Sequence, residues 1–416
     1  MPPGTVVDIE EYGQYTGNEV VERILKKADS LKGVHVANVN STFYGGGVAE
    51  LLSSLTILMN MAGVKTGWRA IQGSPDFFSV TKKMHNALQG GDINLSDRKK
   101  EIYEDTICRN ALHNHLEHHD IVVIHDPQPL PMINQYRKSQ PWIWRCHVDL
   151  TNPHRELWEY LLTFVERYDA MIVSSEQYAR EVSLPQMLFR PALDPFNIKN
   201  KELNEEEMVD RLEHYDIPRD KPLVVQVARF DKWKDPEGVI QAFKIAQKEI
   251  DARLVLLGNI AMDDPEGEKV YNSLLDERSD RIRILSVQDT ALVNSLQRKA
   301  AVVVQKSIRE GFGLTVTEAM WKGAAVVAAN VGGIPTQIED GVNGFLVDSV
   351  EQCAERMVEL VQNPDRRKEL GEKARRSVME HYLLTRLLEQ YFDLFQSFEP
   401  RFTVSGLQEM QVGAKA

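Results

Sequence analysis

The chain has 416 residues, 43% of them hydrophobic and 26% charged, which excludes a disordered or fibrous protein. One hydrophobic core stops growing at roughly 250–300 residues, so this length predicts two domains. The excess of 61 acidic over 49 basic residues (net charge −12) disfavours nucleic acid or an anionic membrane as a partner, so any bound phosphate needs a few focused cations.

The first half of the chain alternates short apolar runs with amphipathic helical patterns. The expected strands are 34–40, 121–124, 142–146 and 171–173. The expected helices are 19–32, 48–59 and 157–168, the second of them after a glycine-rich turn at 44–47. Buried strands that alternate with helices predict a parallel sheet covered on both faces.

A segment with two prolines, 190–195, interrupts this alternation. We place the boundary there, between an N-terminal domain of residues 1–193 and a C-terminal domain of residues 194–382. The alternation then resumes, with expected strands at 223–228, 254–257, 282–285, 302–305, 325–328 and 344–347. The expected helices are 237–249, 270–277, 292–299, 313–322, 351–361 and 366–381. A last helical pattern, 383–398, is expected to return to the first domain, so that residues 383–416 join it.

The predicted fold class is therefore α/β, with two Rossmann-like, doubly wound parallel-sheet domains that face an interdomain cleft. In such sheets, ligands bind outside the carboxyl ends of the strands. Functional side chains are therefore expected in the segments that follow the predicted strands.

The most informative segment is Glu310-Gly-Phe-Gly-Leu-Thr-Val-Thr-Glu318. Its glycines let the backbone approach a ligand, and the helix that begins near Gly313 presents free N–H groups and a positive dipole end, so an anion such as a diphosphate fits there. Glu310 is placed to accept hydrogen bonds from sugar hydroxyls, and Glu318 from a second polyol such as ribose. The alternative is a plain glycine-bearing loop with two surface glutamates.

A basic pair, Arg229 and Lys234, follows the first strand of the second domain. Arginine offers phosphate a planar fork of donors, and lysine offers a mobile point charge. In an acidic chain, this pair is the expected focused cation site. We expect Lys232 to be solvated, and an exposed basic turn is the alternative for the whole segment.

Two further glycine-bearing loops, 41–47 and 331–335, follow expected strands. The first lacks both the G-x-G-x-x-G spacing and the lysine of a P-loop, which counts against binding of NAD and hydrolysis of ATP. Each loop is compatible with a structural turn or with close approach of a ligand to the backbone.

Histidine and acidic side chains follow two strands of the first domain. His147 and Asp149 come after one strand, and their spacing of two predicts that they share a face. His147 could bond a sugar hydroxyl or could be a core histidine. The segment from His125 to Gln128 ends the neighbouring strand, and we interpret it mainly as a loop-capping turn, with acceptor binding as the alternative.

No resident metal is predicted. The histidines 113, 115, 118 and 119 lie in a helical stretch without a matching carboxylate or cysteine set, so we interpret them as a solvated face. The sequence contains no D-x-D motif that could hold Mg²⁺, although binding of the ion in another way is not excluded. The charge of a leaving phosphate must then be met by Arg229, Lys234 and helix N–H groups.

The three scattered cysteines, Cys108, Cys146 and Cys353, show no C-x-x-C spacing and predict reduced thiols. Residues 1–15 lack the pattern of a signal peptide, and no apolar run approaches the ~20 residues of a membrane-spanning helix. We expect a cytoplasmic, soluble protein without membrane or nucleic-acid partners. A homodimer is compatible with the sequence, which does not fix the oligomeric state.

The combination of Arg229…Lys234 with Glu310-x7-Glu318 inside two Rossmann-like halves resembles family 4 of the retaining glycosyltransferases, which have the GT-B fold. The resemblance covers nearly the whole chain. Within the family, segments 125–128 and 144–149 and the overall length are most similar to the trehalose-forming members, which join a nucleotide-activated glucose to free glucose. Retaining trehalose phosphorylases, which use glucose 1-phosphate, and hexosyltransferases with other acceptors are the alternatives within the family.

The resemblance implies roles for individual residues. Arg229 and Lys234 would hold the donor diphosphate, Glu310 would bind hydroxyls of the transferred glucose, and His147 would lie beside that glucose. The donor-binding set would be Gly46, Gly47, Gly311, Phe312, Gly313, Leu314, Thr315 and Glu318, with Glu318 on the ribose. The expected acceptor-binding set is Asn40, Asp126, Gln128 and Asp149. One departure from the family pattern is Ala228, where a glycine is common.

The resemblance also implies a mechanism: a reversible same-face displacement, in which the leaving phosphate oxygen takes the proton of the acceptor. No cofactor is required beyond the nucleotide-diphosphate glucose, whose base, adenine or uracil, the sequence does not fix. Sugar-nucleotide epimerisation and non-catalytic sensing of sugar nucleotides are the alternatives outside transfer. The first domain would then bind the acceptor and the second the donor.

Overall fold

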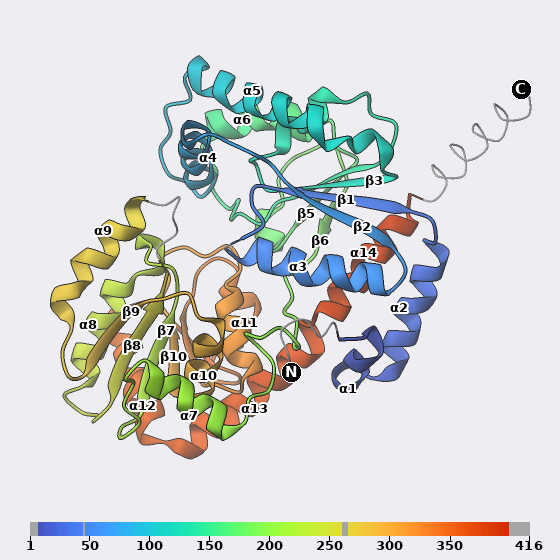
Figure 1. The fold of residues 1–416 in the computed structure, drawn as a ribbon. Coiled ribbons are helices and arrows are strands. Elements are labelled where there is room, and N and C mark those ends of the chain that lie inside the picture. Colours follow the sequence, from blue (N-terminus) through green and yellow to red (C-terminus); the bar gives the residue numbers. More distant parts are fainter. Residues whose placement is uncertain (1–6, 45, 260–264, 399–416) are drawn as a thin grey trace, which may run out of the picture. The chain divides into compact units, whose positions relative to one another are not determined.

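The computed structural model describes residues 7–44, 46–259 and 265–398 (Figure 1). The chain divides into two compact units. Unit 1 comprises Met1–Pro191 and Leu384–Ala416, and unit 2 comprises Ala192–Leu383. The sequence placed these boundaries after residues 193 and 382.

Unit 1 contains a six-stranded parallel sheet with the strand order β2-β1-β3-β4-β5-β6. The strands are β1 (His35–Asn40), β2 (Lys65–Ala70), β3 (Ile121–His125), β4 (Trp142–Arg145), β5 (Ala170–Val173) and β6 (Gln186–Leu188). The helices are α1 (Gly13–Thr16), α2 (Asn18–Ser30), α3 (Gly46–Met61), α4 (Pro75–Leu88), α5 (Asp97–Asn114), α6 (Arg155–Val165) and α14 (Leu384–Gln396).

The sheet of unit 1 lies between two helical layers, with α4, α5 and α6 on one face and α2, α3 and α14 on the other (Figure 1). The core beneath α4–α6 includes Val39, Tyr103, Trp142 and Trp144, each fully buried. The helix expected at 383–398 is α14, which packs on α2 and carries the ion pair between Arg23 and Glu389.

Unit 2 repeats the architecture, with the strand order β12-β11-β10-β7-β8-β9. The strands are β7 (Leu223–Val227), β8 (Arg253–Gly258), β9 (Ile282–Ser286), β10 (Ala300–Gln305), β11 (Val326–Ala329) and β12 (Phe345–Val347). The helices are α7 (Glu205–His214), α8 (Pro236–Ala246), α9 (Pro265–Leu274), α10 (Thr290–Lys299), α11 (Leu314–Trp321), α12 (Val350–Gln362) and α13 (Pro364–His381).

All six strands expected in this half are confirmed, and so is the α/β class with two doubly wound parallel sheets. In unit 1, the sequence did not identify β2, β6, α1, α4 or α5, and in unit 2 it did not identify α7. No helix in the described part of the chain is both long enough and apolar enough to cross a membrane.

The strand order determines where each sheet offers a crevice for a ligand. The order reverses direction between β1 and β3 in unit 1, and between β7 and β10 in unit 2. Such switch points open a crevice at the carboxyl ends of the strands. The candidate residues lie at these strand ends: Asn40 and His125 are the last residues of β1 and β3, and Arg229, Lys234 and Glu310 follow β7 and β10.

Candidate active site

A lysine and a glutamate meet at the switch point of unit 2. Nζ of Lys234 lies 2.5 Å from Oε2 of Glu310, which also accepts a hydrogen bond from the hydroxyl of Ser307 at 3.2 Å. Glu310 is only 8% exposed, and the Lys234 side chain is 18% exposed. The structure therefore brings together two residues that the sequence had placed at the ends of two different strands.

The segment that carries Lys234 is fixed by its own side chains. Asp231 caps the backbone N–H of Trp233, and the carbonyl of Lys234 accepts a hydrogen bond from the buried amide of Gln226 on β7 at 2.8 Å. Asp235 then caps α8 with a positive φ of 49° and pairs with Lys306. These contacts hold the lysine at the end of β7 without help from a ligand.

Arg229 pairs with a different carboxylate. Its side chain is 44% exposed, and its guanidinium lies 3.6 Å from a carboxylate oxygen of Asp231. Lys232 is exposed, as expected, with Nζ 5.0 Å from the centre of the Trp233 ring. The arginine is thus accessible to an anion, whereas Lys234 already has an acidic partner.

The glycine turn before α11 leaves the helix start open. Gly313 has φ 87° and caps α11 without a side-chain acceptor, so the N-cap residue makes no side-chain hydrogen bond to the first N–H groups of the helix. A Cβ at Gly313 would lie 3.1 Å from Cγ of Glu310 and would force an unfavourable φ, so this position needs glycine. Phe312 is buried against Tyr382, which leaves its backbone as the part available to a ligand.

The loop 331–335 supports this turn. Gly333 donates its N–H to the carbonyl of Glu310, and a Cβ there would come within 2.6 Å of the Gly311 carbonyl. Gln337, just beyond the loop, donates to the carbonyl of Phe312 at 2.5 Å. Of the two interpretations that the sequence left open for this loop, these contacts favour the structural turn.

Glu318 is buried on α11, at 3% exposure, and has one unpartnered oxygen. Its Oε1 lies 3.0 Å from Nζ of Lys199, while its Oε2 has no hydrogen-bond partner. A buried carboxylate oxygen without a donor is costly, and a ligand hydroxyl would satisfy it. Sequence reasoning missed Lys199, because it precedes the first strand of this half and belongs to no motif.

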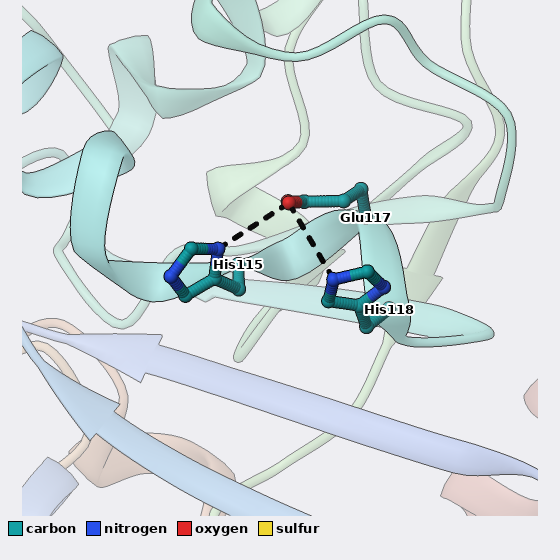
Figure 2. Close-up of side chains that lie close together, drawn as sticks. All are labelled: His115, Glu117 and His118. Atoms are coloured by element: carbon teal, nitrogen blue, oxygen red, sulfur yellow. Dashed lines mark hydrogen bonds and ion pairs between the residues drawn. The ribbon is translucent and has the colours of Figure 1, made fainter.

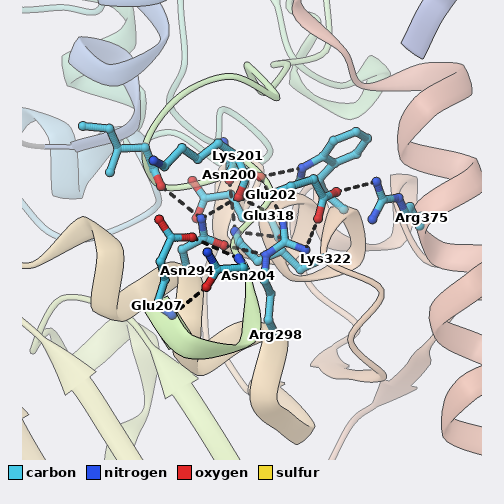
Figure 3. A network of polar contacts seen from close by, with 12 residues as sticks. Asn200, Lys201, Glu202, Asn204, Glu207, Asn294, Arg298, Glu318, Lys322 and Arg375 are labelled. Carbon is cyan, nitrogen blue, oxygen red and sulfur yellow. Dashed lines mark hydrogen bonds and ion pairs between the residues drawn. The ribbon is translucent and has the colours of Figure 1, made fainter. Parts of the chain in front are cut away.

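A polar network holds the segment that carries Lys199 (Figure 3). The buried Lys322 donates to the side chains of Asn200 and Gln297, at 3.0 and 2.8 Å. Asn294 and Arg298 on α10 both donate to the carbonyl of Lys201. The segment is therefore tied to α10 and α11, and Lys199 is fixed beside Glu318.

In unit 1, His125 and His147 lie together. Nδ1 of His125 is 3.1 Å from Nε2 of His147, and the rings are nearly parallel, with 16° between their planes. Burial lowers the pKa of His125 to about 3 and that of His147 well below its usual value, helped by the nearby charge of Arg145. Both imidazoles are therefore neutral at physiological pH.

The expected acceptor-binding residues have different surroundings. Oδ1 of Asn40 accepts from the indole N–H of Trp68 at 2.8 Å, and Oδ1 of Asp149 accepts from the backbone of Thr151 at 2.8 Å. Because β4 ends at Arg145, Asp149 belongs to a loop, so the strand alternation expected to align it with His147 does not apply. Oε1 of Gln128 is buried without a partner.

The glycines at the start of α3 are both exposed. Gly46 is the first residue of the helix, with φ 79°, and Gly47 follows it. Gly45 lies outside the described residues. The backbone here is accessible to a ligand, as the sequence suggested for this loop.

Asp126 has an unusual carboxyl group. Burial raises its pKa to about 7, although the backbone N–H of His147 donates to it at 2.8 Å and Arg145 adds a positive charge. In an unfolded chain, an aspartate ionises near pH 4. Between about pH 4 and pH 7 the folded chain therefore holds a proton that the unfolded chain has lost, and stability falls as pH rises through this window.

The variant Asp126→Asn is expected to remove this pH dependence, because asparagine keeps the acceptor oxygen and tolerates the φ of 63°. As the pH rises from 5 to 8, the free energy of unfolding of the variant should increase relative to that of wild type by on the order of 2 kcal/mol. Thermal unfolding at the two pH values measures the effect, with Asp105→Asn, an exposed site on α5, as the matched control. Equal pH dependence in wild type and Asp126→Asn would contradict this assignment.

The histidine-rich segment is exposed at His113, His115 and His118, as expected for a solvated face, and differs from that expectation at His119. His119 is buried and contacts Arg69, with 2.9 Å between its Nε2 and the guanidinium. A matching carboxylate is also present, because Glu117 lies 3.4 Å from His115 and 3.8 Å from His118 (Figure 2). Ligand atoms of these three exposed residues lie within 4.8 Å of one another, a spacing that could hold a metal ion. They precede β3, whereas His125 ends it, so this group lies near the amino end of β3, opposite the carboxyl end that carries His125.

Comparisons with known proteins agree with this architecture. Residues 38–180 match the family described as "Trehalose synthase, N-terminal domain", and residues 211–377 match "Glycosyl transferases group 1". A trehalose synthase from Thermococcus litoralis is 43% identical over 400 residues, covering 94% of this chain and 97% of the relative. A trehalose phosphorylase from Pleurotus sajor-caju is 27% identical over 417 residues, covering 83% of this chain and 55% of the relative. The structure of a sucrose-phosphate synthase from Thermosynechococcus elongatus has a TM-score of 0.70 at 18% identity, covering 88% of this chain and 98% of that chain.

Two doubly wound sheets, each with polar side chains at its switch point, together with these matches define a glycosyltransferase with the GT-B fold. The hexosyltransferase class expected from the sequence is confirmed. More closely, the chain belongs to the trehalose synthase family.

Proposed function

We propose that this chain makes trehalose by transferring glucose from a nucleoside-diphosphate glucose to free glucose, with retention at the anomeric carbon. The observation that carries the proposal is the contact between Lys234 and Glu310 beside the open start of α11. A cation for phosphate, acceptors for sugar hydroxyls and free N–H groups are what a nucleotide-sugar donor requires.

The proposal assigns the diphosphate to Lys234, the exposed Arg229 and the N–H groups of residues 311–315. Glu310 accepts hydrogen bonds from the transferred glucose, and the unpartnered Oε2 of Glu318 accepts one from the ribose. His147 in unit 1 contacts the same glucose. Asn40, Asp126, Gln128 and Asp149 remain the proposed acceptor-binding set, with Gln128 the strongest member because its buried Oε1 has no partner.

In the proposed reaction, the bond between the anomeric carbon and the phosphate oxygen breaks, and the new bond to the acceptor oxygen forms on the same face. The acceptor proton passes to the leaving phosphate oxygen, so atoms and charges balance without a protein nucleophile. The protein's role is to position both sugars and to stabilise negative charge on the departing diphosphate. The reaction is reversible, because trehalose and a nucleoside diphosphate are themselves substrates for the return direction.

A product screen tests the proposal. The enzyme is incubated with glucose and, separately, ADP-glucose, UDP-glucose or glucose 1-phosphate, and products are separated by chromatography and identified by NMR. We expect α,α-trehalose from a nucleotide-glucose and none from glucose 1-phosphate. Inverted anomeric configuration, or no disaccharide with any donor, would refute the proposal.

A retaining trehalose phosphorylase is the second candidate, favoured by the 27% identity to the enzyme from Pleurotus sajor-caju. It would give trehalose from glucose 1-phosphate in the same screen. The buried Glu318, whose Oε2 lacks a partner, disfavours this candidate, because glucose 1-phosphate has no ribose to occupy it.

A further inference from the structure

Three polar side chains of unit 1 are hydrogen-bonded in series: Asn38, His125 and His147. Nε2 of His125 lies 3.0 Å from Oδ1 of Asn38, and its Nδ1 lies 3.1 Å from Nε2 of His147. Asn38 is 2% exposed and His125 is 1% exposed, while His147 is half-buried. Sheet register explains the alignment, because Asn38 pairs with Val123, which shares a face with His125 two residues later.

We call Asn38, His125 and His147 the row. The donors along the row all point the same way, from His147 toward Asn38. The amide oxygen of Asn38 can only accept, so Nε2 of His125 carries its ring proton. Because both imidazoles are neutral, each has one N–H and one bare nitrogen. Nδ1 of His125 is then bare and accepts the N–H from Nε2 of His147, which leaves Nδ1 of His147 as an acceptor.

We propose that Asn38 and His125 are positioning residues that hold His147 in the Nε2–H tautomer, so that its Nδ1 accepts a hydrogen bond from a hydroxyl of the transferred glucose. The identity of the sugar rests on the proposed function, whereas the tautomer does not. Within the part of the chain that the structure describes, no group bonds Nδ1 of His147, which is therefore available to a ligand.

One buried amide decides the outcome. The observed orientation of Asn38 leaves its Nδ2 buried without a partner. Rotating the amide by half a turn would present Nδ2 to His125 and reverse every proton in the row, which would convert Nδ1 of His147 from an acceptor into a donor. Asn38 thereby determines which hydrogen-bonding partner His147 can accept, although it does not itself contact His147.

The tautomer is measured by ¹⁵N NMR of the full chain with labelled histidine, because protonated and bare ring nitrogens resonate in separate ranges. The signals of His147 are those lost in His147→Gln. We expect a protonated Nε2 and a bare Nδ1 in wild type, and a mixture of tautomers in Asn38→Leu, which removes the acceptor. Asn38→Asp, whose carboxylate can only accept, should restore the single tautomer.

Asn114→Leu is the matched control, because this buried asparagine of α5 donates its amide to the backbone of Asn110 and lies outside the row. It should leave the His147 signals unchanged. In the transfer assay, Asn38→Leu is expected to lower kcat/KM about tenfold, as for one misdirected hydrogen bond, with recovery in Asn38→Asp.

The outcomes separate the two proposals. A protonated Nδ1 on His147, or mixed tautomers in wild type, would refute the proposal that Asn38 and His125 hold His147 in one tautomer, whatever product the enzyme makes. If His147 has a single Nε2–H tautomer but the protein forms no disaccharide, the proposed function is refuted and the proposal about the tautomer stands. If Asn38→Leu does not fold, the spectra of wild type and Asn38→Asp still show which ring nitrogen of His147 is protonated.

Discussion

Replacing Lys234 with alanine is expected to lower kcat/KM for the nucleotide-glucose donor by about 100- to 1000-fold, or roughly 3–4 kcal/mol. The half-buried ammonium group is fixed at the end of β7, where it can meet the charge that develops on the departing diphosphate. An electrostatic contact made in a site of limited water access is worth more than the same contact in water. Arg229→Ala is also expected to cost about 3 kcal/mol, because it removes a forked, charged donor to the same diphosphate.

Lys232→Ala is the matched control, because Lys232 is an exposed lysine on the same turn and should be dispensable. Lys234→Ala also leaves the buried Glu310 without its cation, which can destabilise the fold. The double variant Lys234→Ala/Glu310→Gln separates the two effects, since it should recover thermal stability but not turnover. Wild-type turnover in Lys234→Ala would contradict the assignment of the diphosphate.

Replacing Glu310 with glutamine is expected to reduce kcat about 100-fold, or roughly 3 kcal/mol. Glutamine has a similar size, but it replaces a charged acceptor of sugar hydroxyls with a neutral amide and removes the partner of Lys234. Hydrogen bonds to charged groups contribute about 1.5–3 kcal/mol each, and two such interactions change here.

Steady-state kinetics with varied donor concentration tests this expectation. A loss confined to KM would show that Glu310 binds the ground state and the transition state equally, against the role assigned to it. Glu339→Gln, an exposed glutamate in the same unit, is the control and should be indistinguishable from wild type.

The sequence predicted the strands that have short apolar runs, including β9 and β12 at the two edges of the unit 2 sheet. It missed β2 and β6, which are the two edges of the unit 1 sheet. β6 is half-buried throughout, and β2 buries one residue of six, so neither edge strand needs an apolar run. The missed helices α4 and α5 lie in the connection between β2 and β3, and because β2 was missed, no expected strand marked where this connection begins.

The candidate site could be predicted residue by residue but not contact by contact. Motif spacing placed Lys234 and Glu310 at the ends of two strands, and the pairing of those strands around the switch point brings them into contact. The roles of Lys199, Asn38 and His125 depend on long-range packing, which no local pattern encodes. Ser307 and Lys306, immediately after β10, could have been suspected from their position alone.

The ion pair between Lys234 and Glu310 has a consequence for selectivity. Inorganic phosphate, or any other loose anion, would gain the lysine only by leaving a buried carboxylate without its counter-charge. In the proposed binding mode, a sugar nucleotide compensates both partners at once, because its phosphates take the place of the carboxylate beside Lys234 and its hydroxyls take the place of the ammonium beside Glu310. On this assignment, we expect the enzyme without donor to discriminate against small anions such as inorganic phosphate.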